Sequence, residues 1–217
     1  MDSIIRYFQL GGIPVMLSIL GVLLISLVLV FERAYRYWLV YDLVNSSGFM
    51  AMVQKMVMNN SIENAIRLCK KARPKLLPGV LAEGLKRSND SPQEIENAVE
   101  YAVLNSMPQL HKVTPFLATT ANVATLLGLL GTIFGLMHSF AAVAKATGAQ
   151  KQTLLAEGIS EALNATSFGL ATALFCLFAY GVLQAKQIAI SDDINKNAAR
   201  IVDLLYTRKM KLQSRAR

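Results

Sequence analysis

Three long runs without charge constrain this chain more than any other feature of its sequence. No Asp, Glu, Lys or Arg occurs in residues 7–31, 113–144 or 162–185. A helix that crosses a bilayer needs about 20 predominantly apolar residues, and each run exceeds that length. We therefore expect an all-α integral membrane protein with three transmembrane helices, at residues 13–31, 113–144 and 158–185.

The composition supports this class and argues against two others. Hydrophobic residues make up 53% of the chain and charged residues only 17%, against about 25% charged in soluble domains, so a disordered chain is excluded. The net charge of +8 does not indicate nucleic acid, because no basic patch interleaved with aromatic residues stands clear of the spans. We assign the positive charge to contact with membrane lipids at the inner leaflet.

The distribution of positive charge predicts the orientation. Of the 22 Lys and Arg residues, 11 lie in residues 32–112 and eight after residue 185, against two in residues 145–161. The positive-inside rule then places the N-terminus outside and the C-terminus in the cytoplasm. Residues 145–157 become a short periplasmic connection. Because the N-terminus lacks a basic n-region and a small-residue cleavage site, we expect the first span to be kept as an anchor.

The segments outside the spans also read as helical. Residues 1–12 suit an amphipathic helix on the outer interface, residues 32–112 form a helical cytoplasmic insert, and residues 186–217 extend the third span as a basic helical tail. In the insert, Ser61 is expected to cap a helix that runs to about Ala72, after which Pro74 and Pro78 break the chain.

A clearer helix start follows in the insert. Ser91, Pro92 and Glu94 provide an N-cap, a proline at the first helical position and a capping-box glutamate. We expect that helix to continue into the second span, with Pro108 as a kink.

No residues for an enzyme are evident. The sequence has no glycine-rich phosphate loop, no His-Glu metal box and no Ser/His/Asp set, so we expect neither a metal nor a cofactor. Cys69 falls in the insert and Cys176 in the third span, which makes a disulfide between them improbable.

Small and hydroxyl residues form a stripe along the second span. Their spacing of three and four residues places Thr125, Gly128, Thr132, Gly135 and Ser139 on one helix face. Two interpretations remain open, because small residues at this spacing let membrane helices approach closely, whereas hydroxyls can line a narrow water path.

The third span carries polar residues toward its outer half, among them Asn164 and Thr166. At 1.5 Å per residue, Thr132 lies about 6 Å and Thr166 about 10 Å outward of the centre of its run, so the two threonines can share a depth. Hydroxyls at one depth on facing helices can both donate and accept hydrogen bonds along such a path. The alternative is that each threonine bonds back to its own helix.

Two ionisable residues lie in or beside the spans, where such groups are costly and mark functional sites. Glu161 sits at the outer edge of the third span, where it can serve as an entrance charge or a partner contact. His138 lies two turns from the outer end of the second span, and its unperturbed pKa suits proton transfer. No carboxylate of this chain lies at the membrane centre, so a chain that moves ions would need one from a partner.

These spans resemble a known family. Residues 124–140 (ATLLGLLGTIFGLMHSF) and 158–173 (GISEALNATSFGLATA) are similar to the second- and third-span signatures of the MotA/TolQ/ExbB proton-channel family. The number of spans and the chain length favour the three-span ExbB/TolQ branch.

The resemblance implies a homopentamer around two copies of an ExbD/TolR-like single-span partner, whose helix carries a protonatable Asp. It implies that Thr132 and Thr166 line the pore and that Glu161 contacts the partner or tunes the outer entrance. His138, Asn164, Ser139 and Thr125 are secondary candidates. The resemblance also implies that the chain is a stator of a proton-driven motor in the bacterial inner membrane. A TonB/TolA-like envelope-spanning protein is a possible further partner. Four glycines are expected to pack the helices: Gly128, Gly131, Gly135 and Gly169.

Two departures from the family pattern concern proline. The family often has proline where Thr125 stands, and again where this chain reads Leu174, Phe175 and Cys176, so the local kink geometry is open. A second hypothesis also remains open, a non-conducting membrane scaffold that positions a single-span partner. The sequence does not indicate which system a stator would power, whether TonB-type uptake, Tol-type envelope maintenance or motility. Nor does it indicate whether the stator uses protons or sodium.

Overall fold

The computed structural model describes residues 13–43, 45–72, 74–148 and 150–215, and in these ranges the secondary structure is helical. The helix expected at residues 1–12 lies outside the described residues. The chain divides into two compact units: residues 1–32 with 113–182, and residues 33–112 with 183–217. Three helical stretches, within Ile13–Met58, Pro92–Lys145 and Gln150–Ser214, are long and apolar enough to cross a membrane.

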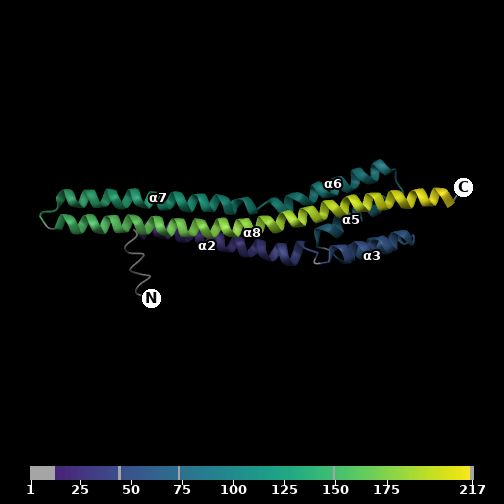
Figure 1. Ribbon diagram of the computed structural model, residues 1–217, viewed down its shortest axis with the longest axis horizontal. Coiled ribbons are helices and arrows are strands. Elements are labelled where there is room, and N and C mark those ends of the chain that lie inside the picture. The colour runs from purple at the N-terminus through teal and green to yellow at the C-terminus, as the bar shows by residue number, and fades with distance from the viewer. Residues whose placement is uncertain (1–12, 44, 73, 149, 216–217) are drawn as a thin grey trace. The chain divides into compact units, whose positions relative to one another are not determined.

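The first unit is built from three helices that lie side by side (Figure 1). They are α2 (Ile13–Tyr35), α7 (Thr114–Lys145) and the first half of α8 (Gln150–Arg215). Its core is thin and consists of small and branched residues. One cluster holds Val15, Ile19 and Ala165, with Leu127 and Phe168 against it.

A second core cluster of the first unit joins the same three helices through smaller residues. Ala121 and Ala124 of α7 meet Ala173 and Cys176 of α8, and Val22 of α2 packs against them. Larger apolar side chains point outward instead, as Phe31 and Phe178 show with exposed fractions of 72% and 75%. This arrangement inverts that of a soluble bundle and is typical of helices that meet lipid or other membrane helices.

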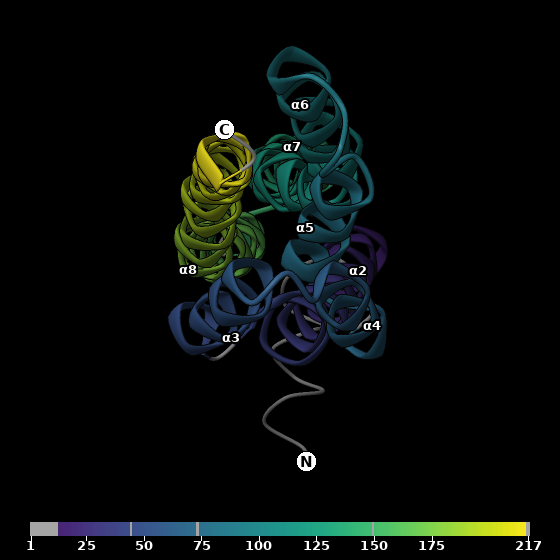
Figure 2. The same ribbon diagram turned by 90° about the vertical axis from the view of Figure 1, so that its right-hand side faces the viewer.

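The second unit contains the segments before and after these spans. They are η1 (Arg36–Tyr41, a π-helix), α3 (Ser46–Met58), α4 (Ile62–Lys71), α5 (Leu76–Lys86), α6 (Pro92–His111) and the end of α8. Consecutive helices from α3 to α6 are neighbours (Figure 2). Close contact is possible where α5 carries Gly84, because a Cβ there would lie 2.6 Å from Val99 of α6 and 3.8 Å from Ile201 of α8.

Buried hydrogen bonds tie three segments of the second unit together. Tyr37, fully buried, lies with its hydroxyl 2.7 Å from the carbonyl oxygen of Leu110 and 3.0 Å from Oε1 of Gln187. The amide nitrogen of Gln187 is 2.5 Å from Nδ1 of His111. Lys186 pairs with Asp42 at 2.6 Å. The last carbonyls of α6 thus find partners from the chain's other segments, as a helix end requires.

The helix starts in the insert were predicted with mixed success. The capping box at Ser91 is confirmed, since Glu94 N–H donates to Oγ of Ser91 at 3.3 Å while the Glu94 carboxylate accepts from the Ser91 backbone at 2.8 Å. The Ser91 hydroxyl also donates to the Glu94 carboxylate, at 2.7 Å, and this bond together with that from the Ser91 backbone N–H holds the pKa of Glu94 below its usual value. Ser61 does precede α4, but its side chain donates to the carbonyl of Asn59 and makes no cap bond.

Two expectations about the helices of the insert were wrong. Pro78 does not break the chain, because it is the third residue of α5, where the missing N–H has no helical partner to lose. The helix that contains Pro108 was expected to continue into the second span, but α6 ends at His111 and a separate helix, α7, starts at Thr114.

The tail is helical as far as Arg215, where α8 ends. The start of α8 lies earlier in the chain than expected. Since α8 starts at Gln150, most of residues 145–157, interpreted as a connection, is helical, and only residues 146–149 separate α7 from α8. Gly148 in this turn has a φ of 53°, a backbone conformation that glycine adopts without strain.

Candidate functional site

The candidate site lies along the contact between α7 and α8, which run antiparallel in the first unit (Figure 1). Glycine brings the two backbones together. A Cβ at Gly128 would lie 3.3 Å from the Cα atoms of Thr166 and Gly169, and one at Gly135 would lie 3.0 Å from Ala162. Because a Cβ at either position would lie closer than most real Cβ contacts, glycine at Gly128 and Gly135 lets the two helices approach more closely than a larger residue would.

Gly131 and Gly169 belong to the same contact. A Cβ at Gly131 would lie 2.5 Å from the Cβ of Ala165 and 3.0 Å from Val15 of α2. A Cβ at Gly169 would lie 2.7 Å from the carbonyl oxygen of Ala124. All four glycines chosen for helix packing thus lie where the helices touch.

Ser139 extends the contact to the end of α7. It is 3% exposed, and its hydroxyl donates to the carbonyl oxygen of Leu154 on α8 at 3.2 Å. A Cβ at Gly158 would overlap the Ser139 side chain. Ser139 therefore joins two helices and is not a free hydroxyl on an open path.

Thr166 makes a hydrogen bond from one helix to the other. Its Oγ1 donates to the carbonyl oxygen of Gly128 at 2.9 Å. The side chain is partly buried. A backbone carbonyl of α7 can accept this second hydrogen bond because Gly128 has no side chain to cover it.

Thr132 and Thr125 instead bond back to their own helix. Thr132 donates to the carbonyl of Leu129 at 2.6 Å, and Thr125 to that of Asn122 at 2.7 Å. Both side chains are half-exposed. Their hydroxyl oxygens keep lone pairs that can accept further hydrogen bonds.

Helix geometry places these three threonines on one flank of the α7–α8 contact. Leu127 and Phe168 mark the flank that faces α2, because both pack against the cluster that Val15 and Ile19 of α2 form with Ala165 of α8. At about 100° per residue, Thr132 lies about 140° around α7 from Leu127, and Thr166 about 160° around α8 from Phe168. The threonine flank is therefore the one that α2 leaves open.

Glu161 and His138 lie on the other flank. Glu161 is seven residues before Phe168 and His138 eleven after Leu127, so each is within about 20° of its marker residue. The contacts of Gly135 with Ala162 and of Ser139 with Gly158 put the two at the same level of the bundle. His138 is exposed and Glu161 half-buried, and no ion pair joins them. The structure thus separates these ionisable side chains from the threonines.

Two further polar residues complete the account of this unit. Asn164 is half-exposed and lies one turn before Phe168, on the flank of α2. Thr172 was not among the chosen site residues. It is 2% exposed, and its hydroxyl has no hydrogen-bond partner among the described residues. A buried, unpaired hydroxyl is costly, yet nothing in the sequence distinguished Thr172 from the other threonines of its span.

Within the described ranges, no group of three or more His, Cys, Asp or Glu side chains is arranged to hold a metal ion. The cysteines of the two units are both buried and free. Burial raises the pKa of Cys69 to about 11.

Comparison with known proteins agrees with this architecture. The family model described as the MotA/TolQ/ExbB proton channel family matches residues 72–196. The ExbB-like 3 protein of Synechocystis is 32% identical over 199 residues, which cover 91% of this chain and 92% of that protein.

Two relatives match shorter regions. The Tol-Pal system protein TolQ of Haemophilus influenzae is 40% identical over 116 residues, half of each chain. The biopolymer transport protein ExbB of Pseudomonas putida is 30% identical over 135 residues, 62% of this chain and 39% of that protein. The matched region thus spans about half the length of these two relatives or less. A family model that matches more than half of the chain, together with three apolar helices and a relative aligned over nearly the full length, shows that the chain is a membrane protein of the MotA/TolQ/ExbB proton channel family.

Proposed function

We propose that the chain is the ExbB/TolQ-type stator subunit of a proton-driven motor in the bacterial inner membrane. In this proposal five copies enclose two copies of an ExbD/TolR-like single-span partner, and protons move between the partner helix and the threonine flank. The N-terminus is periplasmic and the C-terminus cytoplasmic. The work done would be transport, envelope maintenance or motility, in keeping with relatives named for biopolymer transport and the Tol-Pal system.

The observation that supports the proposal is the flank of α7 and α8 that α2 leaves open. It presents Thr125, Thr132 and Thr166, whose hydroxyl oxygens can each accept a hydrogen bond from a proton carrier or from water. No Asp or Glu occurs in residues 113–144. A carboxylic acid on the partner helix would therefore supply the group that binds and releases the proton, with Thr132 and Thr166 lining its path.

Glu161 takes a different role in this proposal. It lies near the N-terminal end of α8 on the flank of α2, away from the threonines. From that place it would tune the charge at the outer entrance or contact the partner. His138, at the same level on α7, would be a secondary group of that entrance.

Proton flux through proteoliposomes that contain the chain with its co-purified single-span partner tests the proposal. We expect Thr132→Ala with Thr166→Ala to lower the flux while the assembly stays intact, and Thr132→Ser with Thr166→Ser to retain most of it. Unchanged flux in the alanine double variant would remove the threonines from the path.

A non-conducting scaffold is a second candidate, and two observations favour it. The glycines form a close helix contact, and the hydroxyls of Thr125 and Thr132 donate to carbonyl oxygens of their own helix. A scaffold would still assemble with every threonine variant, although Thr166 variants lose one hydrogen bond between the helices, but it would fail on Gly128→Leu or Gly135→Leu, because bulk separates the helices. The flux assay therefore distinguishes the two candidates.

A further inference from the structure

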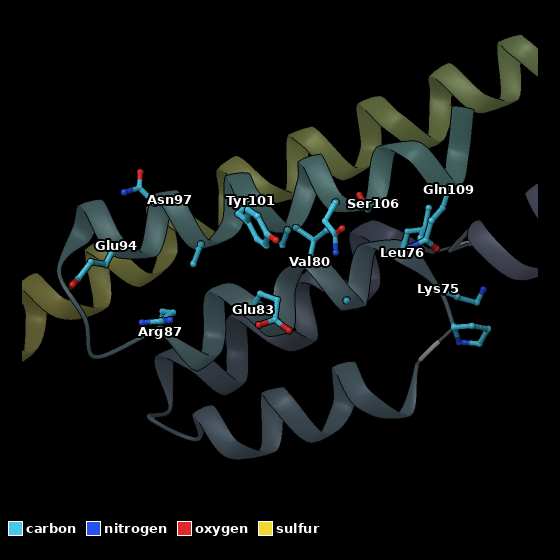
Figure 3. Close-up of a pocket in the computed structure, with 15 residues that line it drawn as sticks. Lys75, Leu76, Val80, Glu83, Arg87, Glu94, Asn97, Tyr101, Ser106 and Gln109 are labelled. Carbon is cyan, nitrogen blue, oxygen red and sulfur yellow. The ribbon is translucent and has the colours of Figure 1, made fainter. Parts of the chain in front are cut away.

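Two hollows in the second unit differ in how their charges are satisfied. The first, about 850 Å³, lies between α5 and α6 (Figure 3). Figure 3 shows Glu83 and Arg87 on one wall and Glu94 and Tyr101 on the other. Its charged groups already have partners in the chain: Glu83 pairs with Lys86 at 2.6 Å, Arg87 with Asp90 at 3.2 Å, and Glu94 accepts from Ser91.

The second hollow is a groove of about 630 Å³ between α6 and α8. Ile95, Val99 and Ala198 form its buried floor, with exposed fractions of 1%, 3% and 6%. Tyr206 at one end is 48% exposed. Because these three side chains are almost fully buried, the apolar surface that is open in the groove comes from the half-buried Val103 and Val202 and from the exposed Ala199 and Tyr206.

The rims of this groove are acidic. Glu96 and Glu100 lie on the α6 side and Asp203 on the α8 side, all three exposed. None has an ion pair among the residues that the structure describes, and no Lys or Arg lines the groove. The nearby cations of α8, Lys196 and Arg200, lie outside the lining and pair with none of the three. Negative rims around an apolar floor stand out in a chain with a net charge of +8.

We propose that this groove, termed the α6–α8 groove, binds a cationic amphipathic segment of the single-span partner on the cytoplasmic side of the membrane. Such a segment would lay its apolar residues on Val103, Val202 and Tyr206, with Lys or Arg against the carboxylates on the rims. This is the helix-in-groove mode of peptide recognition. The proposal rests on the proposed function, because that function supplies the partner.

The position of the groove along α8 fits this occupant. Asn195 and Tyr206 lie ten and 21 residues after Ala185, the last residue of the charge-free run, or about 15 and 32 Å along the helix. An extended chain covers about 3.3 Å per residue, so it reaches the groove within about five to ten residues of the membrane edge. The positive-inside rule enriches Lys and Arg in that range of a partner's cytoplasmic segment.

A peptide-binding experiment on the full-length chain in nanodiscs of zwitterionic lipid tests the inference. The probe is a fluorescein-labelled helical peptide of about 15 residues built from Lys, Leu and Ala, and its counterpart has Glu in place of Lys. We expect the Lys peptide to bind and the Glu peptide not to bind, by fluorescence anisotropy at physiological salt. Equal binding of both peptides would overturn the proposal, because charge would then have no part in recognition.

Matched charge variants locate the binding. Glu100→Gln with Asp203→Asn removes two charges from the rims, whereas Glu63→Gln with Asp192→Asn removes two exposed charges elsewhere in the second unit. We expect the rim pair to weaken binding by about fivefold or more and the control pair by less than about twofold. An equal loss in both pairs would mean attraction to the unit's overall charge and would contradict a specific groove.

Cysteine labelling shows whether the groove is open in the assembled protein. Ala199 lines the groove and is exposed, whereas the native Cys69 and Cys176 are buried. We expect Ala199→Cys to react with a maleimide and the Lys peptide to protect it. A thiol that stays unreactive without peptide would mean that a second copy covers the groove, and one that the peptide fails to protect would place the peptide elsewhere; either result overturns the proposal.

These measurements are independent of the test of the proposed function. Peptide binding needs neither the partner nor proton flux. A chain that conducts protons but does not bind the peptide disproves the groove alone, and loss of conduction in the threonine variants with intact peptide binding disproves the proton path alone.

Discussion

The hydroxyl of Thr166 donates to the carbonyl oxygen of Gly128 at 2.9 Å, where the backbones of α7 and α8 come closest. This bond bears on both interpretations of the small-residue stripe, as a close helix contact and as the lining of a water path. The glycine allows close approach, and the approach lets a threonine that was expected to line a pore hold the neighbouring helix. Thr166 therefore has a structural role whether or not protons pass beside it.

Thr166→Val tests that role, because it keeps the shape of the side chain and removes the hydroxyl. Hydrogen bonds between membrane helices contribute about 0.6 kcal/mol on average and at most about 1.7 kcal/mol. We expect Thr166→Val to lower the thermal unfolding midpoint of the detergent-solubilised protein by a few degrees and Thr166→Ser to stay near wild type. Identical midpoints for all three proteins would show that the bond does not stabilise the helix pair.

Two glycines of α8 differ in what surrounds them, and this difference predicts opposite effects of the same substitution. A Cβ at Gly169 would lie 2.7 Å from the Ala124 carbonyl oxygen and 2.8 Å from the Cα of Gly128, whereas one at Gly181 meets nothing within 4 Å. Because backbone atoms cannot rotate away, we expect Gly169→Ala to destabilise the protein by about 1–3 kcal/mol. Gly181→Ala is the control and is expected to be neutral or stabilising, since alanine favours a helix by about 1 kcal/mol over glycine. Guanidinium or thermal unfolding of both variants measures the difference, and equal destabilisation would contradict the contact.

The capping box at the start of α6 predicts a pH dependence in the second unit. Ser91→Ala removes the cap and is expected to cost about 1 kcal/mol of unfolding free energy. Hydrogen bonds from Ser91 lower the pKa of Glu94, so its contribution is fully present above the ordinary carboxyl pKa and is lost as the pH falls through the lowered value. Ser91→Ala should therefore be less destabilising at pH 3 than at pH 7, as unfolding at the two pH values will measure. An equal cost at both would show that the Glu94 charge takes no part in the cap.

The native cysteines are expected to resist alkylation. Cys69 is fully buried, and burial raises its pKa to about 11, so hardly any thiolate is present at neutral pH. Cys176 is also fully buried. Maleimide labelling followed by mass spectrometry should find both thiols unmodified at pH 7 in the folded protein and modified after denaturation. Rapid labelling of Cys69 in the folded protein would mean that α4 opens on the time scale of the reaction.

The sequence predicted the helices well where one local signal dominated. Charge-free length indicated three apolar helices, and the serine, proline and glutamate at residues 91–94 predicted the start of α6. Proline was less informative, because its effect depends on its place in the helix. Pro74 lies between α4 and α5 as expected, whereas Pro78 is tolerated in the first turn of α5, a difference that the residue's identity alone does not reveal.

The candidate site was predictable in its residues but not in its geometry. The spacing of three and four residues correctly put Gly128 and Gly135 on one face. It could not show that the Thr132 hydroxyl donates to its own helix while the Thr166 hydroxyl donates to a carbonyl oxygen of α7, because that difference depends on the register of α7 against α8. Nor could it show that Glu161 and His138 lie on the flank that faces α2 and the threonines on the opposite flank.

The subunit count of the purified chain tests the stator proposal most directly. Native mass spectrometry of the detergent-solubilised protein should find five copies, with any co-purified single-span partner present as two. A chain that stays a monomer or dimer in the presence of that partner would contradict the account, because the threonine flank would then enclose no path.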